Sequence, residues 1–431
     1  MIPSPWLSGI MKILISPAIF IYMLISAACN HAGRGKHKDE QVSPFREGEF
    51  GYDLQFLKKQ DSALIVLKDG EAQLIVSPRY QAKVFTSTAQ GERGLSFGWI
   101  NYKAFGNKVD SHMNAYGGEN RLWLGPEGGK YSLFFKPGSQ MVFDNWKTPA
   151  AFDTEKWNLK SKDSNSVTMF KEMNLLNYTG SKLRLIVERS IRILDRQEII
   201  GKISRAGITG MDSVNVVGYE TENVLTNKSG QEWTEVTGMP CIWILDMFKP
   251  SPATLIVVPF QRLAGERFDK IATTNYFGEI PSYRLKHNDS LIVFRADGKS
   301  RGKLGIASNK AKQMAGSYDA EHKVLTIIFF DLDVQARYLN QEWNTKKPSF
   351  SGDAVNAYND GPVANGTQMG PFYELESVSS AAFLRPNASL SHDHYVFHFS
   401  GNEKVLDELA KKLLGISLEQ INTTFLNENT K

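Results

Sequence analysis

The segment from Tyr116 to Gly129 (YGGENRLWLGPEGG) sets chemically versatile side chains among glycines. Glycine lets a backbone turn at positive φ or approach a ligand closely. The side chains offer two carboxylate acceptors, a guanidinium with five donors and an indole face. They belong to Glu119, Glu127, Arg121 and Trp123. This composition predicts a binding site, although it names no reaction.

Other residue patterns argue against several classes of enzyme. The chain has no G-x-x-x-x-G-K-[ST] phosphate loop, no G-x-S-x-G nucleophile elbow and no H-E-x-x-H zinc helix. His392 and His394 form an H-x-H pair that could begin a metal site, yet only Asp393 lies nearby and it points the other way. The sequence therefore predicts no metal and no cofactor.

The elements that must position these residues are mostly short β-strands between turn signals. A turn at Lys68-Asp69-Gly70 joins the first two strands as a hairpin. The expected strands include Ala63–Leu67, Gln73–Val76, Lys83–Thr86, Tyr131–Phe135, Lys182–Val187, Thr254–Val258, Ser290–Phe294, Val324–Phe330 and His394–Phe399.

Helical spacing is nearly absent until Glu403–Leu414, whose apolar residues fall on one face and which Gly415 can cap. Many strands and one terminal helix predict an all-β fold, a large antiparallel β-sandwich with a C-terminal helix. No Pro/Gly/Ser-rich linker interrupts the chain between Glu47 and Ser417. We therefore expect one domain over residues 47–421.

The N-terminus indicates export. Residues 11–28 contain a basic start, an apolar run and small residues before Cys29, which is the layout of a cleaved signal peptide. Small residues just before a cysteine resemble the lipobox of bacterial lipoproteins, in which the cysteine is lipidated. Residues 29–46 are largely polar and predict a solvated tether. We expect a protein of the cell envelope, lipid-anchored and facing the periplasm or the cell surface.

Composition sets further limits. Cys241 is the only cysteine besides Cys29, so we expect no internal disulfide, and its apolar surroundings predict a buried structural thiol. The net charge is only +4, and no basic block with interleaved aromatic residues occurs. Nucleic acid is therefore not an expected partner.

Three segments in the same order along the chain resemble galactose-mutarotase-like proteins and their lipoprotein relatives. Gln73–Ala89 is similar to the opening hairpin, Tyr116–Gly129 to a Gly-Gly…Arg-Leu-Trp…Pro-Glu loop, and Phe372–Phe399 to the closing strands around a Leu-Arg-Pro turn. A weaker similarity includes Thr237–Phe260. The resemblance implies the supersandwich fold and a concave site for a carbohydrate.

The resemblance also implies a chemistry. Aldose mutarotases use a carboxylate to take the anomeric hydroxyl proton and a histidine to protonate the ring oxygen. Glu374 and Glu376 share one side of a late strand. Either residue is similar in position to the catalytic base of the mutarotases. The alternative is that one of them is a surface carboxylate. No histidine lies between His112 and His287, so no residue of this chain matches the histidine that protonates the ring oxygen in the mutarotases. His112 can approach the site from another strand, or it has a structural role.

Arg121 can either bind a ligand or stabilise the loop in which it lies. Its guanidinium can fork onto a carboxylate or vicinal sugar hydroxyls, or it can pair with Glu119 or Glu127 and hold the loop. Trp123 lies on the same side of an extended strand, where it can stack on a sugar or belong to the core. Asp360 sits in a turn that can bring it to the mouth of the site.

The resulting hypothesis is a carbohydrate-handling lipoprotein, either a sugar-modifying or epimerase-like enzyme or a non-catalytic glycan-binding protein. A saccharide and the membrane are the expected partners. Polar groups that hold a sugar must converge, so we expect Arg121 and at least one of Glu374 and Glu376 to share one accessible concavity. A purely structural envelope protein would instead bury the Tyr116–Gly129 segment without a cleft.

The lipoprotein hypothesis predicts the behaviour of Cys29→Ser. A serine cannot carry a thioether-linked lipid, so this variant should move from the detergent phase to the aqueous phase in a detergent partitioning experiment. Unchanged partitioning of the variant would contradict lipidation at Cys29.

Overall fold

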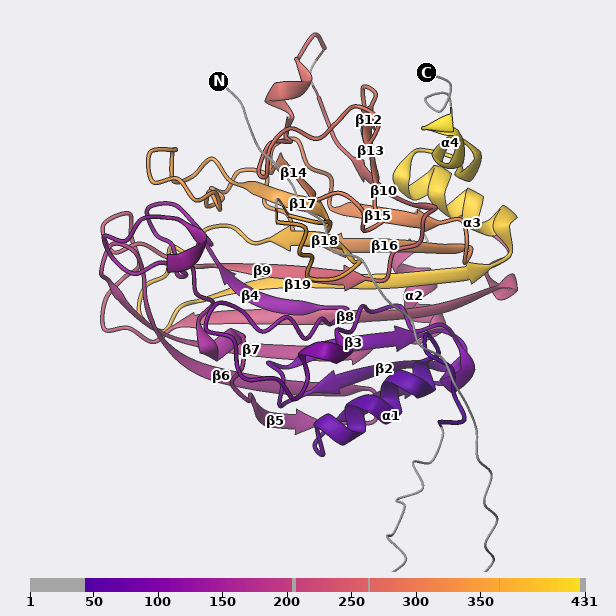
Figure 1. Cartoon of the computed structure of the whole chain (residues 1–431), viewed down its shortest axis with the longest axis horizontal. Coiled ribbons are helices and arrows are strands. Elements are labelled where there is room, and N and C mark those ends of the chain that lie inside the picture. Colours follow the sequence, from indigo (N-terminus) through magenta and orange to yellow (C-terminus); the bar gives the residue numbers. More distant parts are fainter. Residues whose placement is uncertain (1–42, 204–206, 263, 364, 427–431) are drawn as a thin grey trace, which may run out of the picture. The chain divides into compact units, whose positions relative to one another are not determined.

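Antiparallel β-sheets make up most of the chain in the computed structural model, which describes residues 43–426 apart from 204–206, 263 and 364 (Figure 1). The predicted signal peptide, Cys29 and most of the predicted tether lie outside the described residues. From Ser43 onward the described residues form one compact unit. Cooperative unfolding of residues 47–421 as one domain stays a prediction.

Three sheets are present in the described part of the chain. The ten-stranded sheet has the order β12 (Leu285–His287), β13 (Leu291–Arg295), β10 (Thr254–Pro259), β15 (Met314–Asp319), β16 (Val324–Phe330), β19 (Ser389–Gly401), β8 (Val214–Asn227), β7 (Lys182–Ile193), β6 (Ser166–Leu176) and β5 (Asn158–Lys162). The six-stranded sheet has the order β11 (Ala272–Thr273), β14 (Gly302–Ala307), β17 (Asp353–Asn359), β18 (Tyr373–Val378), β9 (Cys241–Phe248) and β4 (Arg121–Gly125). The three-stranded sheet contains β1 (Ile65–Asp69), β2 (Ala72–Ser77) and β3 (Lys83–Thr88).

The two larger sheets pack face to face. Tyr373 of β18 shares a hydrogen bond of 2.8 Å with Ser317 of β15, and Ser377 of β18 shares one of 2.8 Å with His394 of β19. Apolar side chains from both sheets fill the space between them, and their burial drives the packing. They include Leu304, Leu375, Ile244, Ile328 and Val396. The predicted antiparallel β-sandwich is thus confirmed.

Strand burial shows which sheet faces are covered. In β7 buried residues alternate with more exposed ones, as in a strand with one face on the core and one near solvent. In β9 and β18 every residue is buried, although only one face meets the ten-stranded sheet. The other face of the six-stranded sheet must therefore be covered by connecting segments.

The predicted C-terminal helix is present. It comprises α3 (Glu403–Leu409) and one π-helical turn (Ala410–Leu414), and Gly415 caps it at a φ of 79°. Leu406 and Leu409 pack with Val257 and Phe397 of the ten-stranded sheet. Helix α4 (Leu418–Thr423) follows directly, and both helices lie at one end of the sheets (Figure 1).

Helix α4 was not predicted, and neither were two helices nearer the N-terminus. Helix α1 (Phe50–Gln60) buries Phe50, Leu54 and Leu57 beside the three-stranded sheet. Those three residues have helical spacing, but the segment is short. Helix α2 (Arg196–Ile203) has a similarly weak apolar pattern, with Ile199 and Ile203 buried. Both depend on tertiary packing, because short helices are marginal alone.

The predicted hairpin is confirmed, whereas one predicted strand is wrong. β1 and β2 pair with Asp69 opposite Ala72, so the turn consists of the two residues between them. Tyr131–Phe135 is not a strand but a buried irregular segment. Its backbone bonds to loops, as in Leu133 N–H to Pro126 O at 3.0 Å. Its aromatic residues pack as core, which explains the misleading apolar run.

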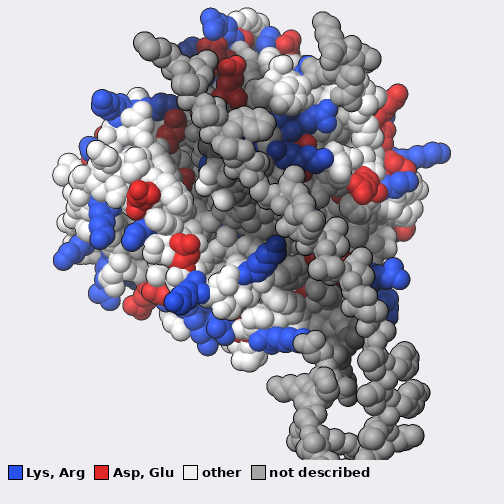
Figure 2. Space-filling model, in the orientation of Figure 1, with Lys and Arg blue, Asp and Glu red and all other residues white. Residues whose placement is uncertain are grey.

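The surface carries mixed charge. Basic and acidic side chains are interspersed among uncharged ones on the face in Figure 2. Among the described residues, no helix combines the length and the apolar character needed to cross a membrane.

Candidate functional site

Polar and aromatic side chains cluster on the outer face of the six-stranded sheet. Glu374 points away from the ten-stranded sheet, because the alternating residues Tyr373 and Ser377 bond to it. The antiparallel register places Lys303 of β14 opposite Tyr358 of β17, and Tyr358 opposite Glu374. The strand order therefore gathers residues that lie far apart in the sequence.

A cavity of about 250 Å³ lies over this face. The strands supply the floor of the cavity, which consists of Arg121, Trp123, Trp243, Leu245, Met247, Lys303, Tyr358 and Glu374. The connecting segments supply the walls, which consist of Asp110, His112, Met113, Glu127, Phe143, Trp146, Phe277, Arg301, Trp343, Met369 and Phe372. The mixture of apolar lining and a few converging polar groups is typical of small-molecule sites.

An ion pair between Arg121 and Glu374 crosses the cavity floor. Arg121 Nη2 lies 2.6 Å from Glu374 Oε1, and the two side chains are 7% and 9% exposed. Arg121 is on β4 and Glu374 on β18, with β9 between them. The buried Nε of Arg121 has no hydrogen-bond partner in the described part of the chain. The pair therefore leaves donor capacity unused.

Glu376 is held away from the cavity. Both of its carboxylate oxygens accept from Lys303 Nζ, at 2.7 and 3.0 Å, and the indole Nε1–H of Trp243 donates to it at 2.9 Å. It is completely buried, whereas Glu374 lines the cavity. Of the two predicted glutamates, Glu374 is thus the one that a ligand can reach.

Two carboxyl groups of the cavity have raised pKa values. Burial raises the pKa of Glu374 to about 7, against the opposing effect of Arg121. Burial also raises the pKa of Glu127 to about 7, against the opposing charge of Lys303. Groups that titrate near neutral pH can both accept and donate protons there.

Four tryptophans form a continuous aromatic surface in the cavity. Trp343 stacks with Trp146 at 6.0 Å between ring centroids, and Trp146 lies 6.5 Å from Trp123. Trp123 meets Trp243 edge to face at 5.6 Å. Sugar rings present an apolar face and polar edges, and amphipathic aromatic side chains suit the apolar face.

The glycines fix the path of the loop before β4. Gly117 has a φ of 81°, and a Cβ atom there would lie 2.3 Å from the carbonyl oxygen of Trp99. The ammonium of the buried Lys83 donates to Gly117 O at 2.9 Å. Only glycine fits this position, so these glycines serve loop geometry and direct the chain into β4.

The structure places two predicted binding residues outside the cavity lining. Glu119 is completely buried and accepts from Ser87 N–H at 2.5 Å and Ser87 Oγ at 2.7 Å. It also lies 3.1 Å from His398 Nε2. Asp360 accepts a hydrogen bond of 2.8 Å from the hydroxyl of Tyr358, a residue that lines the cavity. Neither carboxylate lines the cavity in this structure, and a ligand-binding role for Glu119 or Asp360 stays a prediction.

The other predicted residues come together. Arg121, Trp123, Glu127, Glu374 and His112 line one cavity, as the shared-concavity hypothesis expects. Arg121 pairs with Glu374 and with neither glutamate of its own loop. Because the Tyr116–Gly129 segment contributes to the lining of a cavity, it is not buried without a cleft. The roles of these residues in binding or catalysis stay predictions.

His112 lies in the wall of the cavity, and its contacts are with other residues of that wall. Its Nδ1 is 3.4 Å from the carbonyl oxygen of Trp146, and its ring stacks on Phe143 at 4.7 Å. These contacts suit a structural role in the rim, although the side chain remains partly accessible.

The H-x-H pair belongs to a buried network between the two larger sheets. His392 Nε2 and His394 Nδ1 each lie 2.8 Å from Ser377 Oγ, and His394 Nε2 lies 2.7 Å from Asp246. None of these side chains lines the cavity. Cys241 is a buried free thiol, as predicted, and burial raises its pKa to about 12.

Several cavity residues escaped the sequence analysis. Trp243 alternates with Leu245 and Met247 along β9, a pattern that the uniformly apolar segment conceals. Lys303 and Arg301 reach the cavity only because β14 is in the same sheet as β18. No local signal identifies these two basic residues, since their position depends on strand order.

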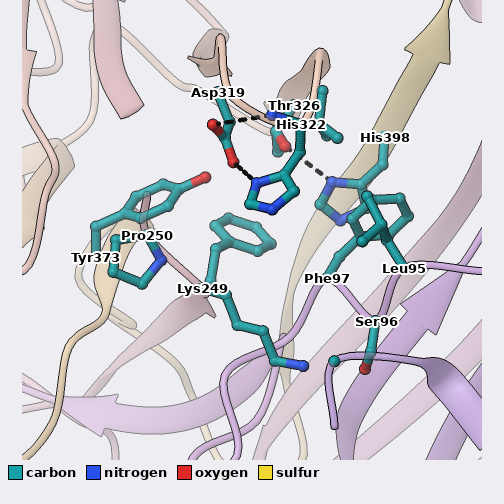
Figure 3. A pocket seen from close by; sticks show the side chains of 13 residues that line it. Leu95, Ser96, Phe97, Lys249, Pro250, Asp319, His322, Thr326, Tyr373 and His398 are labelled. Carbon is teal, nitrogen blue, oxygen red and sulfur yellow. Dashed lines mark hydrogen bonds and ion pairs between the residues drawn. The ribbon is translucent and has the colours of Figure 1, made fainter. Parts of the chain in front are cut away.

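A smaller cavity of about 130 Å³ lies elsewhere in the described structure, between the ends of β9, β15 and β16 (Figure 3). His322 Nδ1 bonds to Asp319 at 2.6 Å, and Thr326 Oγ1 shares a hydrogen bond of 2.8 Å with His398 Nδ1. These four side chains are thus already hydrogen-bonded in pairs. The larger cavity, with two carboxyl groups whose pKa values burial raises to about 7, is the better candidate.

Comparison with known proteins identifies the family. A model described as a family of unknown function, DUF6786, matches residues 48–425. The chain belongs to the DUF6786 family. No curated protein matches this DUF6786 protein.

Several solved structures are similar to this DUF6786 protein. A galactose mutarotase-like protein from Lactobacillus casei ATCC 334 is 11% identical, with a TM-score of 0.45, over 78% of this chain and 100% of that chain. The Slr1438 protein from Synechocystis sp. PCC 6803 is 12% identical, with a TM-score of 0.47, over 79% and 96%. A galactose mutarotase related enzyme from Lactobacillus acidophilus is 9% identical, with a TM-score of 0.43, over 79% and 98%. Two of these three structures are described as galactose mutarotase-like or galactose mutarotase related.

The raised pKa of Glu127 predicts a pH-dependent effect of Glu127→Gln. The protonated form is favoured in the folded state, so the stability that this group contributes is present at low pH and is lost as pH rises through about 7. A glutamine cannot ionise. The melting temperature of the variant relative to wild type should therefore rise by about 2 °C or more between about pH 5 and pH 8.

Glu232→Gln is the matched control, because Glu232 is an exposed glutamate. Its melting temperature should follow that of the wild type across the same pH range. Parallel curves for Glu127→Gln and wild type would show that Glu127 titrates normally.

Proposed function

We propose that this protein binds a saccharide in the cavity over the six-stranded sheet and acts on its anomeric centre by acid–base catalysis. The observation that carries the proposal is the ion pair of Arg121 and Glu374, which lies in a tryptophan-lined cavity. The resemblance of the sequence motifs to mutarotase-like proteins supports a carbohydrate as the ligand.

The cavity offers a sugar both kinds of contact that it requires. The surface formed by Trp123 and Trp243 can receive the apolar face of the ring. The guanidinium of Arg121, which lines the cavity, can donate to hydroxyl oxygens at the edge of the ring. Binding and orientation together would then bring the anomeric hydroxyl to Glu374.

Glu374 is the proposed general base and Glu127 the proposed general acid. Burial raises the pKa of each to about 7, so one can be ionised while the other is protonated at neutral pH. Opening of a sugar ring requires removal of a proton from the anomeric hydroxyl and protonation of the ring oxygen. Glu127 would thus protonate the ring oxygen, the step for which the sequence offers no matched histidine.

A non-catalytic glycan-binding protein is the second candidate. The observation that favours it is the close contact of 2.6 Å between Glu374 and Arg121, which stabilises the ionised carboxylate and reduces its basicity. The same cavity would then hold a glycan without turnover. In either case we propose anchoring in the cell envelope through Cys29, on the basis of the N-terminal sequence pattern.

Glu374→Gln should separate the two candidates. The amide keeps the shape of the side chain but cannot act as a base, so anomerisation should slow by about a hundredfold or more. NMR exchange spectroscopy on a panel of aldoses and uronic acids measures that rate, and a direct binding assay on the same panel should show retained affinity. Glu232→Gln serves as the control and should leave both quantities unchanged.

Catalysis of anomerisation by the wild type that survives Glu374→Gln would contradict the role of this residue. Saturable binding without anomerisation of any sugar in the panel would favour the glycan-binding alternative.

A further inference from the structure

The basic residues of the inner cavity are already compensated. Arg121 pairs with Glu374 at 2.6 Å, and Lys303 pairs with Glu376 at 2.7 Å. Each of these pairs is buried. A neutral ligand therefore meets no net excess of fixed positive charge at the cavity floor.

Arg301 at the cavity wall is different. Its side chain is exposed, and its guanidinium lies over the ring of Phe277, 3.8 Å from the ring centroid. It makes no hydrogen bond or ion pair with any other described side chain, although its charge opposes the effect of burial on the pKa of Glu127. The contact with Phe277 fixes the position of the guanidinium while leaving its donors free.

A shallow depression continues outward from the cavity and shares Arg301 and Phe277 with it. Its volume is about 400 Å³, and its remaining described lining is Lys299, Ser300, Pro362 and Val363. Among these lining residues there are two cations and no carboxylate.

Lys299 is exposed and forms no ion pair within the described ranges. Its backbone N–H donates to Asp297 at 3.0 Å, but Asp297 is already paired with Arg284 at 2.5 Å. The outer depression thus presents two cations without an ion pair among the described residues, next to a cavity floor whose two basic residues are already paired.

We propose that the saccharide carries an acidic substituent, a carboxylate or a sulfate ester, and that this group binds to Arg301 and Lys299 while the sugar ring occupies the inner cavity. The inference rests on the proposed function, because it specifies the substrate class of the same site. A planar guanidinium with free donors can hold either anion through two parallel hydrogen bonds. Lys299 adds a second charge at the solvent side.

The test compares sugars that differ only in charge. Calorimetric affinities are measured for galactose against galacturonate, glucose against glucuronate, and glucose against glucose 6-sulfate. At low salt at least one acidic sugar should bind about tenfold more tightly than its neutral partner. The preference should fall at high salt, and the comparison of glucuronate with glucose 6-sulfate distinguishes the two anions.

The Arg301→Gln and Lys299→Gln double variant should lose this preference, so that the acidic sugar binds no more tightly than its neutral partner. Arg385→Gln is the matched control, because Arg385 is an exposed arginine that lines neither the cavity nor the depression. It should retain the full preference.

Equal affinity of the wild type for neutral and acidic sugars would overturn this inference and leave the proposed function standing. A preference that survives in the double variant, or that is lost in Arg385→Gln, would also overturn it. Failure of every sugar in the panel to bind would overturn the proposed function, and this inference with it.

Discussion

The buried ion pair between Arg121 and Glu374 is the constraint on which the site depends. It joins strands β4 and β18 across β9 and so fixes the floor of the cavity. Burial of two charges costs free energy that their attraction offsets only with good geometry, and removal of one partner typically costs about 3–5 kcal/mol. Apolar residues would often serve stability equally well, so the pair is better explained by a task at the cavity surface.

In the proposed function, the same pair links binding of the sugar to the chemistry. A ligand that takes hydrogen bonds from Arg121 would weaken its contact with Glu374 and raise the basicity of the carboxylate. Glu376 cannot share this role, because Lys303 and Trp243 satisfy it beneath the floor. Binding of the sugar would thus activate the base where the proton is to be removed.

The sequence predicts the fold better than it predicts the site. Short apolar runs between turn signals indicate the sandwich, but they do not specify strand order, and strand order brings Lys303 and Arg301 to the same cavity as Glu374. Glu119 was predicted to share the site with its neighbour Arg121. Its carboxylate instead bonds to Ser87, because the preceding glycines adopt positive φ and redirect the chain. Local spacing cannot reveal such a reversal.

The most direct test of the account is a crystal structure of the protein with a saccharide that binds to it. We predict one sugar ring against the tryptophan-lined floor, with hydroxyl groups within hydrogen-bonding distance of Arg121 and Glu374. A saccharide bound instead beside His322 in the smaller cavity, with the larger cavity unchanged, would contradict the central claim.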